Sequence, residues 1–406
     1  MAGAMRSITR CVFTCKLSGR KHSACLASCS GIKWPQATGE RHLATKYGLL
    51  DTGTDIIPLA DAKRFMTDCM MAVGSPREHA EALAVLLAEA DYRGHYSHGM
   101  NRLDMYVSDI QYGNCDPKAK PSILKESPAT AWVHGNNGIG AVVGNFCMAL
   151  AIKKAKEAGV GWVACKGSNH YGIAGMYTMQ AMASGLLGMS FTNSSPFLTP
   201  TRSKQASLGT NPISLAAPSK GDPFVLDMAT TAVAVGKIEM ERRKGNPIPR
   251  GWALGPTGQV ETDAEVAFKT GRLMPLGGEE CNSGYKGYGL GMLVEIFCGV
   301  LGGANFGRNI RKWGSQDSLA NLGHCFVAVN PECFAPGFTG RMEELIDMMR
   351  QSEQVDADSP VLIAGDPERA HMKAVDDHGG VRYVKDQMAT CAKLAKELNV
   401  KPLQSL

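Results

Sequence analysis

Apolar residues recur at helical spacing in the first third of the chain. Leu103, Tyr106, Val107 and Ile110 follow the i, i+3, i+4, i+7 pattern of a helix that buries one face. We therefore predict a helix over residues 99–112, ended by the glycine that follows it.

A second helix is predicted upstream from its start signal. Ser75 has the position of an N-cap, Pro76 that of the first helical residue and Glu78 that of the third, which together form a capping box. We expect the apolar pattern that follows to stop at Gly94, because glycine commonly ends helices.

The rest of the chain alternates short strand patterns with helix patterns, which predicts an α/β or α+β fold. Expected strands cover 131–133, 160–165, 187–192, 213–217, 224–227 and 325–329, and expected helices cover 141–157, the stretch near 290, 341–352 and 384–398. The longest apolar stretch, 290–301, is interrupted by Glu295 and spans about 12 residues, whereas a bilayer requires roughly 20. We expect a buried helix there and no membrane partner.

Charge is unevenly distributed along the 406 residues, whose net charge is +5. Much of the excess lies in residues 1–46, which are rich in Lys, Arg, Ser and Cys and hold one acid, Glu40. This composition resembles an organellar transit peptide and predicts a mitochondrial location. The alternative is a disordered extension without a targeting role, on a cytoplasmic protein. The remainder is near neutral, which argues against a nucleic-acid partner.

The 13 cysteines form no CxxC pair and show no Cys/His spacing typical of metal ligands. We interpret them as reduced thiols in a reducing compartment, and we expect no metal site.

Residues 138–144 follow a predicted strand and open a predicted helix, as a GxGxxG dinucleotide fingerprint does. The glycine spacing is wrong by one residue, and Cys165 and Lys166 stand where an acid would contact the ribose. These departures argue against a standard Rossmann site and favour a tight turn that packs a helix on a sheet.

Candidate chemistry begins at residues 93–102, a glycine-flanked segment with Ser97, His98 and Arg102. His98 can take a proton near neutral pH, and the planar guanidinium of Arg102 suits a carboxylate. Being four positions apart, these two side chains would share one helix face. The adjacent Ser97 also suggests a serine hydrolase, although it lacks a GxSxG elbow, and its plain alternative is a helix N-cap.

Further candidates follow predicted strands. His170 lies just past the strand at 160–165, at the kind of sheet edge where α/β proteins bind ligands. The loops at 192–194 and 209–212, and Lys286 among glycines before a helix, have the composition of ligand-binding segments. Each has a structural alternative, either a histidine that satisfies loop carbonyls or a glycine-rich turn.

Taken together, these segments resemble the malate/L-lactate dehydrogenase type 2 family, whose members act on malate, lactate, sulfolactate, ureidoglycolate, 2,3-diketogulonate and cyclic imino acids. The matching motifs are RGxxSHGxxR at 93–102, SNHxGIAG at 168–175, GTNP at 209–212, LDMATTxxAxGKI at 226–238 and GYKGYGL at 284–290. The likeness runs from about residue 47 to the C-terminus.

The resemblance implies an NAD(P)-binding domain that is not Rossmann, built on a largely antiparallel sheet beside a mixed helical domain, in a homodimer. It implies a hydrogen-bonded relay of Ser97, His98 and Asp227, with Arg102 on the substrate carboxylate. It places His170 against nicotinamide and substrate as the proton acceptor, although the family leaves open which histidine moves the proton. The implied cofactor contacts are His170, Tyr171, Gly172, Ile173, Ala174, Thr192, Asn193, Ser194, Lys286 and Gly303.

We therefore expect an NAD- or NADP-dependent 2-hydroxy-acid dehydrogenase with a small anionic substrate, malate- or lactate-like. The alternatives are a cyclic imino acid reductase of the same family, a serine hydrolase and an inactive nucleotide-binding relative. Arg202 and Lys204 would either contact the 2′-phosphate of NADP or be solvated loop charges.

The expected organisation is a leader or extension at 1–46, a helical substrate domain at 47–125, the NAD(P)-binding domain at 126–310 and a return segment at 311–406 that completes the helical domain.

Overall fold

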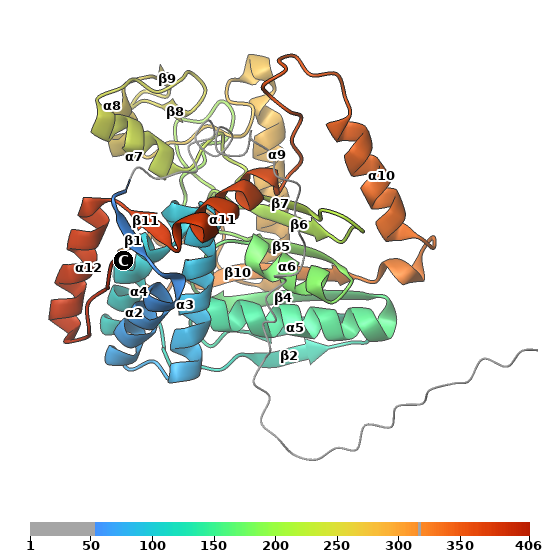
Figure 1. The fold of residues 1–406 in the computed structure, drawn as a ribbon, viewed down its shortest axis with the longest axis horizontal. Coiled ribbons are helices and arrows are strands. Elements are labelled where there is room, and N and C mark those ends of the chain that lie inside the picture. Colours follow the sequence, from blue (N-terminus) through green and yellow to red (C-terminus); the bar gives the residue numbers. More distant parts are fainter. Residues whose placement is uncertain (1–52, 316–317) are drawn as a thin grey trace, which may run out of the picture. The chain divides into compact units, whose positions relative to one another are not determined.

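A seven-stranded sheet is the centre of the computed structural model, which describes residues 53–315 and 318–406. The strand order is β2-β3-β4-β10-β5-β6-β7 (Figure 1). The strands are β2 (Ser122–Glu126), β3 (Thr130–His134), β4 (Val160–Ser168), β5 (Leu187–Thr192), β6 (Ile213–Ala217), β7 (Phe224–Met228) and β10 (Leu322–Val329). β3 and β4 are parallel, and the other neighbouring pairs are antiparallel. The predicted α/β class is confirmed as a mixed α/β fold with a largely antiparallel sheet.

Helices cover both faces of this sheet. They are α5 (Gly140–Ala158) and α6 (Gly175–Ala183) on one face, and α9 (Gly284–Glu295) with the π-helical turn Ile296–Val300 on the other. Successive strand residues point to opposite faces, so Phe326 and Ala328 of β10 pack with α5 and α6, whereas Cys325 and Val327 pack with α9 and the π turn. Burial on both sides explains why this strand reads as a continuous apolar run.

The first and last helices form a separate helical layer. They are α2 (Leu59–Ala72), α3 (Arg77–Tyr92), α4 (Leu103–Gln111), α11 (Asp366–His378) and α12 (Lys385–Leu398). Their apolar stripes bury Phe65, Leu83 and Leu394 in one core. The short strand β1 (Asp55–Ile57) pairs antiparallel with β11 (Val381–Tyr383), so segments from both ends of the described chain close this layer.

The predicted helix over 99–112 begins later than expected, because two 3-10 turns precede it. The turns are η1 (Tyr96–His98) and η2 (Met100–Arg102). They meet at Gly99, where any Cβ would overlap the Asp91 carboxylate, so the close approach requires glycine. His98 and Arg102 therefore lie on different turns, and the prediction that they share one helix face is wrong.

The helix predicted from the capping box begins at Arg77, with Pro76 in the N-cap position. Pro76 has a ψ of 147°, which is extended, so the first helical residue is the next one. Among the described residues Ser75 Oγ has no hydrogen-bond partner, and the predicted side-chain cap is wrong. The end is as predicted, because Gly94 follows the helix with a φ of 86°.

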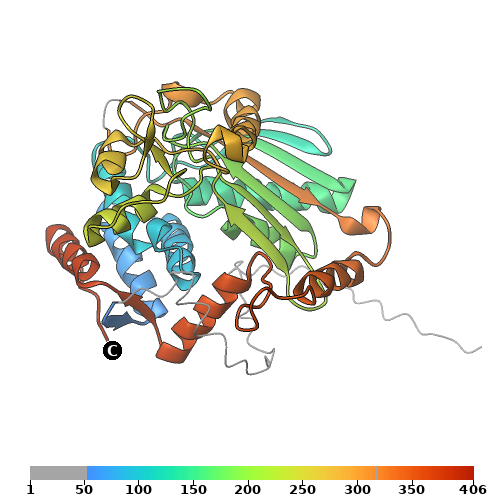
Figure 2. The same ribbon diagram turned by 90° about the horizontal axis from the view of Figure 1, so that it is seen from above.

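A small lobe with its own core follows β7. Its elements are α7 (Val235–Lys244), β8 (Ala253–Leu254), β9 (Val260–Glu261) and α8 (Ala264–Thr270). Val233, Ile248 and Leu273 are buried in this core. At the opposite end of the sheet from α12 lies α10 (Phe338–Arg350), as both Figure 1 and Figure 2 show.

The predicted return segment 311–406 contributes to two parts of the structure. Its strand β10 lies between β4 and β5 at the centre of the sheet, which corrects its placement in the helical domain, whereas α11 and α12 belong to the helical layer. The division into domains at 47–125 and 126–310 stays a prediction, and the leader at 1–46 lies outside the described residues. Within the described ranges, no helix combines the length and apolar character needed to cross a bilayer.

Candidate active site

One cavity of about 430 Å³ collects side chains from segments far apart in the sequence. Its walls come from the turns η1 and η2, the loop after β4, the strand β7, the start of α7 and the segment 310–313. The predicted site residues that line it are Ser97, His98, Arg102, His170, Gly172, Ile173, Ala174, Ser194 and Asp227. A cavity of this size is in the usual range for small-molecule sites.

The two predicted histidines face each other across this cavity. The rings of His98 and His170 are nearly parallel, at 21°, with centroids 5.7 Å apart. Burial, reinforced by Arg102, lowers the pKa of His98 to about 4. Burial, reinforced by His98, also holds the pKa of His170 well below its ordinary value. Both rings are therefore neutral at physiological pH before any anion binds.

Sequence reasoning missed the two aromatic residues that hold His170. Tyr106 Oη lies 2.6 Å from His170 Nδ1. The indole of Trp313 stacks on the imidazole at a centroid distance of 4.1 Å and an angle of 22°. Tyr106 is part of the apolar stripe that predicted the helix at 99–112, so the sequence pattern indicated core packing and concealed its hydroxyl contact.

Arg102 has a guanidinium available to an anion. Its Nε donates to the Ser97 carbonyl at 2.7 Å, and Nη1 contacts Met105 Sδ at 3.8 Å. Among the described residues, no carboxylate pairs with it. Arg102 is half-buried and lines the cavity, so an anionic ligand there would gain both charge and hydrogen bonds from its guanidinium.

Of the predicted relay of Ser97, His98 and Asp227, the structure contains the contact between Ser97 and His98. Ser97 Oγ lies 2.9 Å from His98 Nδ1. Asp227 lines the same cavity, but its Oδ2 accepts the backbone N–H of Gly175 at 2.6 Å, at the start of α6, and within the described residues it has no hydrogen bond to Ser97 or His98. Burial raises the pKa of Asp227 to about 7. The complete relay therefore stays a prediction.

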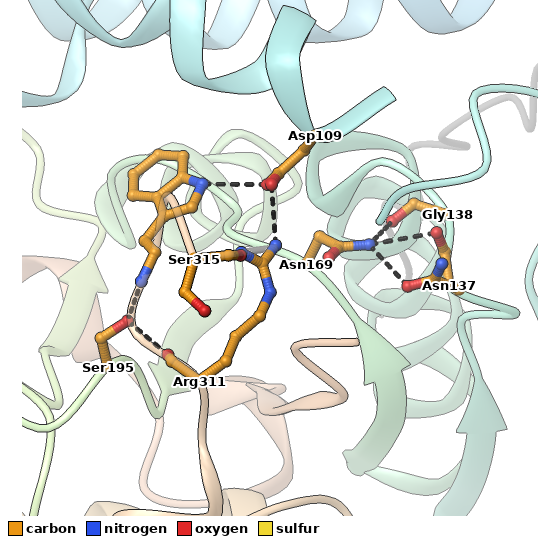
Figure 3. A network of polar contacts seen from close by, with 8 residues as sticks. Asp109, Asn137, Gly138, Asn169, Ser195, Arg311 and Ser315 are labelled. Atoms are coloured by element: carbon orange, nitrogen blue, oxygen red, sulfur yellow. Dashed lines mark hydrogen bonds and ion pairs between the residues drawn. The ribbon is translucent and has the colours of Figure 1, made fainter. Parts of the chain in front are cut away.

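A buried ion pair between Asp109 and Arg311, drawn in Figure 3, supports the cavity wall that carries Trp313. Asp109 on α4 accepts from Arg311 Nη2 at 2.8 Å and from the indole N–H of Trp313 at 2.9 Å. The two side chains of the pair are only 3% and 10% exposed. Ser195 extends the network, since it donates to the Arg311 carbonyl and accepts the backbone N–H of Trp313, both at 2.9 Å. Asp109 thus fixes the indole that stacks on the histidine.

The loop that carries His170 is anchored from its other side. Asn169 Nδ2 donates to the carbonyls of Asn137 and Gly138, each at 3.0 Å (Figure 3). The glycine-rich segment 138–144 thus packs against this loop. A Cβ on Gly140 would overlap the His170 carbonyl, so glycine allows the close approach. This supports the interpretation of the segment as a structural turn.

Several predicted cofactor positions do not line the cavity. Tyr171 is buried in the core. Thr192 Oγ1 lies 2.7 Å from His324 Nδ1, and Asn193 Nδ2 donates to the buried Glu295 at 2.9 Å, so both brace the ends of strands.

The remaining predicted positions lie on the surface. Lys286 on α9 and Gly303 are exposed and lie outside the cavity. Arg202 is exposed too and pairs with Glu280 at 2.6 Å, which favours the interpretation of a solvated loop charge. In the described part of the chain, no cluster of His, Cys, Asp and Glu is arranged to hold a metal ion.

Comparisons with known proteins identify the family and the fold of this chain. The sequence model of the malate/L-lactate dehydrogenase family matches residues 57–390. A malate dehydrogenase of Pyrococcus abyssi is 43% identical over 310 residues, which are 76% of this chain and 85% of the relative. An L-sulfolactate dehydrogenase of Methanocaldococcus jannaschii is 38% identical over 79% of this chain and 92% of its own. The solved malate dehydrogenase of Pyrococcus horikoshii has a TM-score of 0.81 at 34% identity, covering 87% of this chain and 98% of that one.

Proposed function

The chain belongs to the malate/L-lactate dehydrogenase family and is thus a 2-hydroxy-acid dehydrogenase, and we propose that its cavity binds NAD or NADP beside a small 2-hydroxy or 2-oxo acid. One observation carries this proposal: two facing imidazoles and an arginine without an acidic partner share a single cavity. These groups supply what oxidation at C2 requires of a protein, which is a carboxylate anchor and polar groups at the hydroxyl.

The cavity fits a nicotinamide ring. Gly172, Ile173 and Ala174 form one stretch of its wall, and Phe197 and Ile310 add apolar surface suited to a flat ring. When bound, the nicotinamide accepts or supplies the hydride, and the protein provides position and electrostatics. Support for a binding domain that is not Rossmann comes from the sheet, which has one parallel pair among antiparallel ones, and from the failed GxGxxG spacing.

Arg102 is the proposed anchor of the substrate carboxylate. Its Nε bond to the carbonyl of Ser97, at 2.7 Å, holds the guanidinium beside the residue that precedes His98. A carboxylate held there would bring its C2 oxygen toward the nitrogens of the two imidazoles, where a proton can be moved. A malate- or lactate-like acid meets this description, and so does a cyclic imino acid.

The alternatives from other classes lack comparable support. A serine hydrolase would need a carboxylate that orients His98, and in the described residues none is bonded to it. An inactive nucleotide-binding relative would have no need for an arginine without an acidic partner beside two half-buried histidines. The homodimer and the mitochondrial location both stay predictions.

A turnover screen tests the proposal. The purified chain is mixed with NAD⁺ or NADP⁺ and a panel of 2-hydroxy acids, and with NADH or NADPH and 2-oxo acids or cyclic imines, while absorbance of the reduced nicotinamide is followed. Turnover on a 2-hydroxy or 2-oxo acid supports the proposal, and turnover on the imines alone supports the reductase alternative. Cofactor binding without any turnover would favour the inactive relative.

Substituting Arg102→Ala should raise KM by about 10- to 150-fold, because it removes a charge-assisted pair worth roughly 1.5–3 kcal/mol. Steady-state kinetics with the best substrate measures this change. Arg341→Ala is a matched control, since Arg341 lies on α10 and does not line the cavity. An unchanged KM in the Arg102 variant would remove this residue from the substrate site.

A further inference from the structure

His170 Nδ1 faces two groups of this chain. Tyr106 Oη lies 2.6 Å away, and the backbone N–H of Gly172 donates to the same nitrogen at 3.3 Å. A backbone N–H can only donate, so Nδ1 must present its lone pair. The hydroxyl of Tyr106 must then donate to it as well. Burial raises the pKa of Tyr106, which keeps the hydroxyl proton in place.

We infer that Tyr106 is a positioning residue that holds neutral His170 with its proton on Nε2, so that His170 donates a hydrogen bond to the substrate oxygen while His98 takes the proton. A neutral imidazole has one N–H and one lone pair, and the lone pair of His170 is used at Nδ1. Its Nε2 therefore has no lone pair for the hydroxyl proton. This inference rests on the proposed function, and it differs from the proton-acceptor role that the family resemblance implies for His170.

The surroundings of His170 also disfavour its imidazolium form. A second proton on Nδ1 would point at the N–H of Gly172, which is a donor facing a donor. Ring rotation would not relieve this, because Trp313 stacks on the imidazole at 4.1 Å and is itself tied to Asp109. His170 thus stays a neutral donor, suited to stabilising negative charge that develops on the substrate oxygen.

His98 is free of this restriction. Its Nδ1 faces Ser97 Oγ at 2.9 Å, and a hydroxyl can accept as well as donate. With the ring proton on Nδ1 donated to Ser97, the lone pair of His98 Nε2 is available. On oxidation, the substrate O–H bond breaks and an N–H bond forms at His98 Nε2. The C2–H electron pair leaves as hydride to the proposed nicotinamide cofactor, and the C2 oxygen becomes a carbonyl.

Nitrogen-15 NMR of the imidazole rings tests the tautomer without any substrate. We expect the full chain, labelled at histidine and assigned with the variant His170→Asn, to show a protonated Nε2 and an unprotonated Nδ1 for His170. In Tyr106→Phe the ring should populate a mixture of tautomers. The exposed Tyr112→Phe, at the end of the same helix, is the matched control and should leave the His170 signals unchanged. A proton on Nδ1 of His170 in the wild-type chain would overturn the inference.

Kinetics test the division of roles. Tyr106→Phe should lower kcat about tenfold, as expected for one lost hydrogen bond, with KM changed less than about twofold. Added imidazole should restore part of the oxidation rate of His98→Ala but not that of His170→Ala, because only His98 is replaced as a base. Rescue of His170→Ala alone would contradict the inference.

If the wild-type chain oxidises no 2-hydroxy acid, the proposed function fails, whereas the NMR result still decides the tautomer.

Discussion

His170→Ala is expected to lower kcat by about a hundredfold or more. The variant removes the group that polarises the substrate oxygen. A positioned acid, base or oxyanion donor typically raises the rate by about a hundredfold or more. KM should change far less, because Arg102 still holds the carboxylate. Rates of product formation at saturating substrate measure the effect.

A control separates this loss from misfolding. His134→Ala replaces a histidine of β3 that does not line the cavity, and we expect near wild-type kcat from it. Thermal unfolding of both variants shows whether the fold survives. A folded His170→Ala enzyme with near wild-type turnover would exclude His170 from the chemistry.

Asp109→Ala should destabilise the chain by about 3–5 kcal/mol, because it leaves the guanidinium of Arg311 buried without its counter-charge. It should also lower activity, since Asp109 accepts the indole N–H of Trp313, which stacks on His170. Denaturant unfolding gives the change in the free energy of unfolding, and steady-state kinetics at low temperature gives the change in activity.

Two comparisons sharpen this test. Glu397→Ala breaks the exposed pair with Lys393 and should cost less than about 1 kcal/mol. Asp109→Leu with Arg311→Met removes both buried charges and should recover much of the stability, but not the activity, because the indole loses its acceptor. A small effect of Asp109→Ala alone would show that the pair is not a support of this wall.

Local patterns in the sequence predicted many of the strands and helices, because periodicity and turn residues act over a few positions, but they gave no prediction for α2, α6 or α11. The strand at 187–192 and the helix at 384–398 have nearly the expected bounds. The helix expected at 99–112 failed at its start, since the Asp91 carboxylate reaches Gly99 from the preceding helix and no local pattern reports such a contact. β10 was recognised as a strand, but its place in the sheet depends on pairing with distant strands.

The candidate site was predicted where motifs carried it and missed where it depends on distant contacts. Motif matching located His98, Arg102 and His170, which the fold brings to one cavity. The indole of Trp313 and the carboxylate of Asp109 are 204 positions apart, and nothing local to either residue indicates their bond. Lys286 was predicted as a site residue because its glycine-rich surroundings favoured an anion site. It is exposed on α9 and lies outside the cavity.

Transfer of deuterium from a 2-hydroxy acid labelled at C2 would show whether this cavity carries out hydride transfer. We expect mass spectrometry to find one deuterium in the reduced nicotinamide, and we expect the Arg102→Ala variant to transfer it at a much lower rate from the same dilute substrate. Reduced cofactor that carries no label, or no reduced cofactor with any acid of the panel, would contradict the assignment of this cavity to hydride transfer.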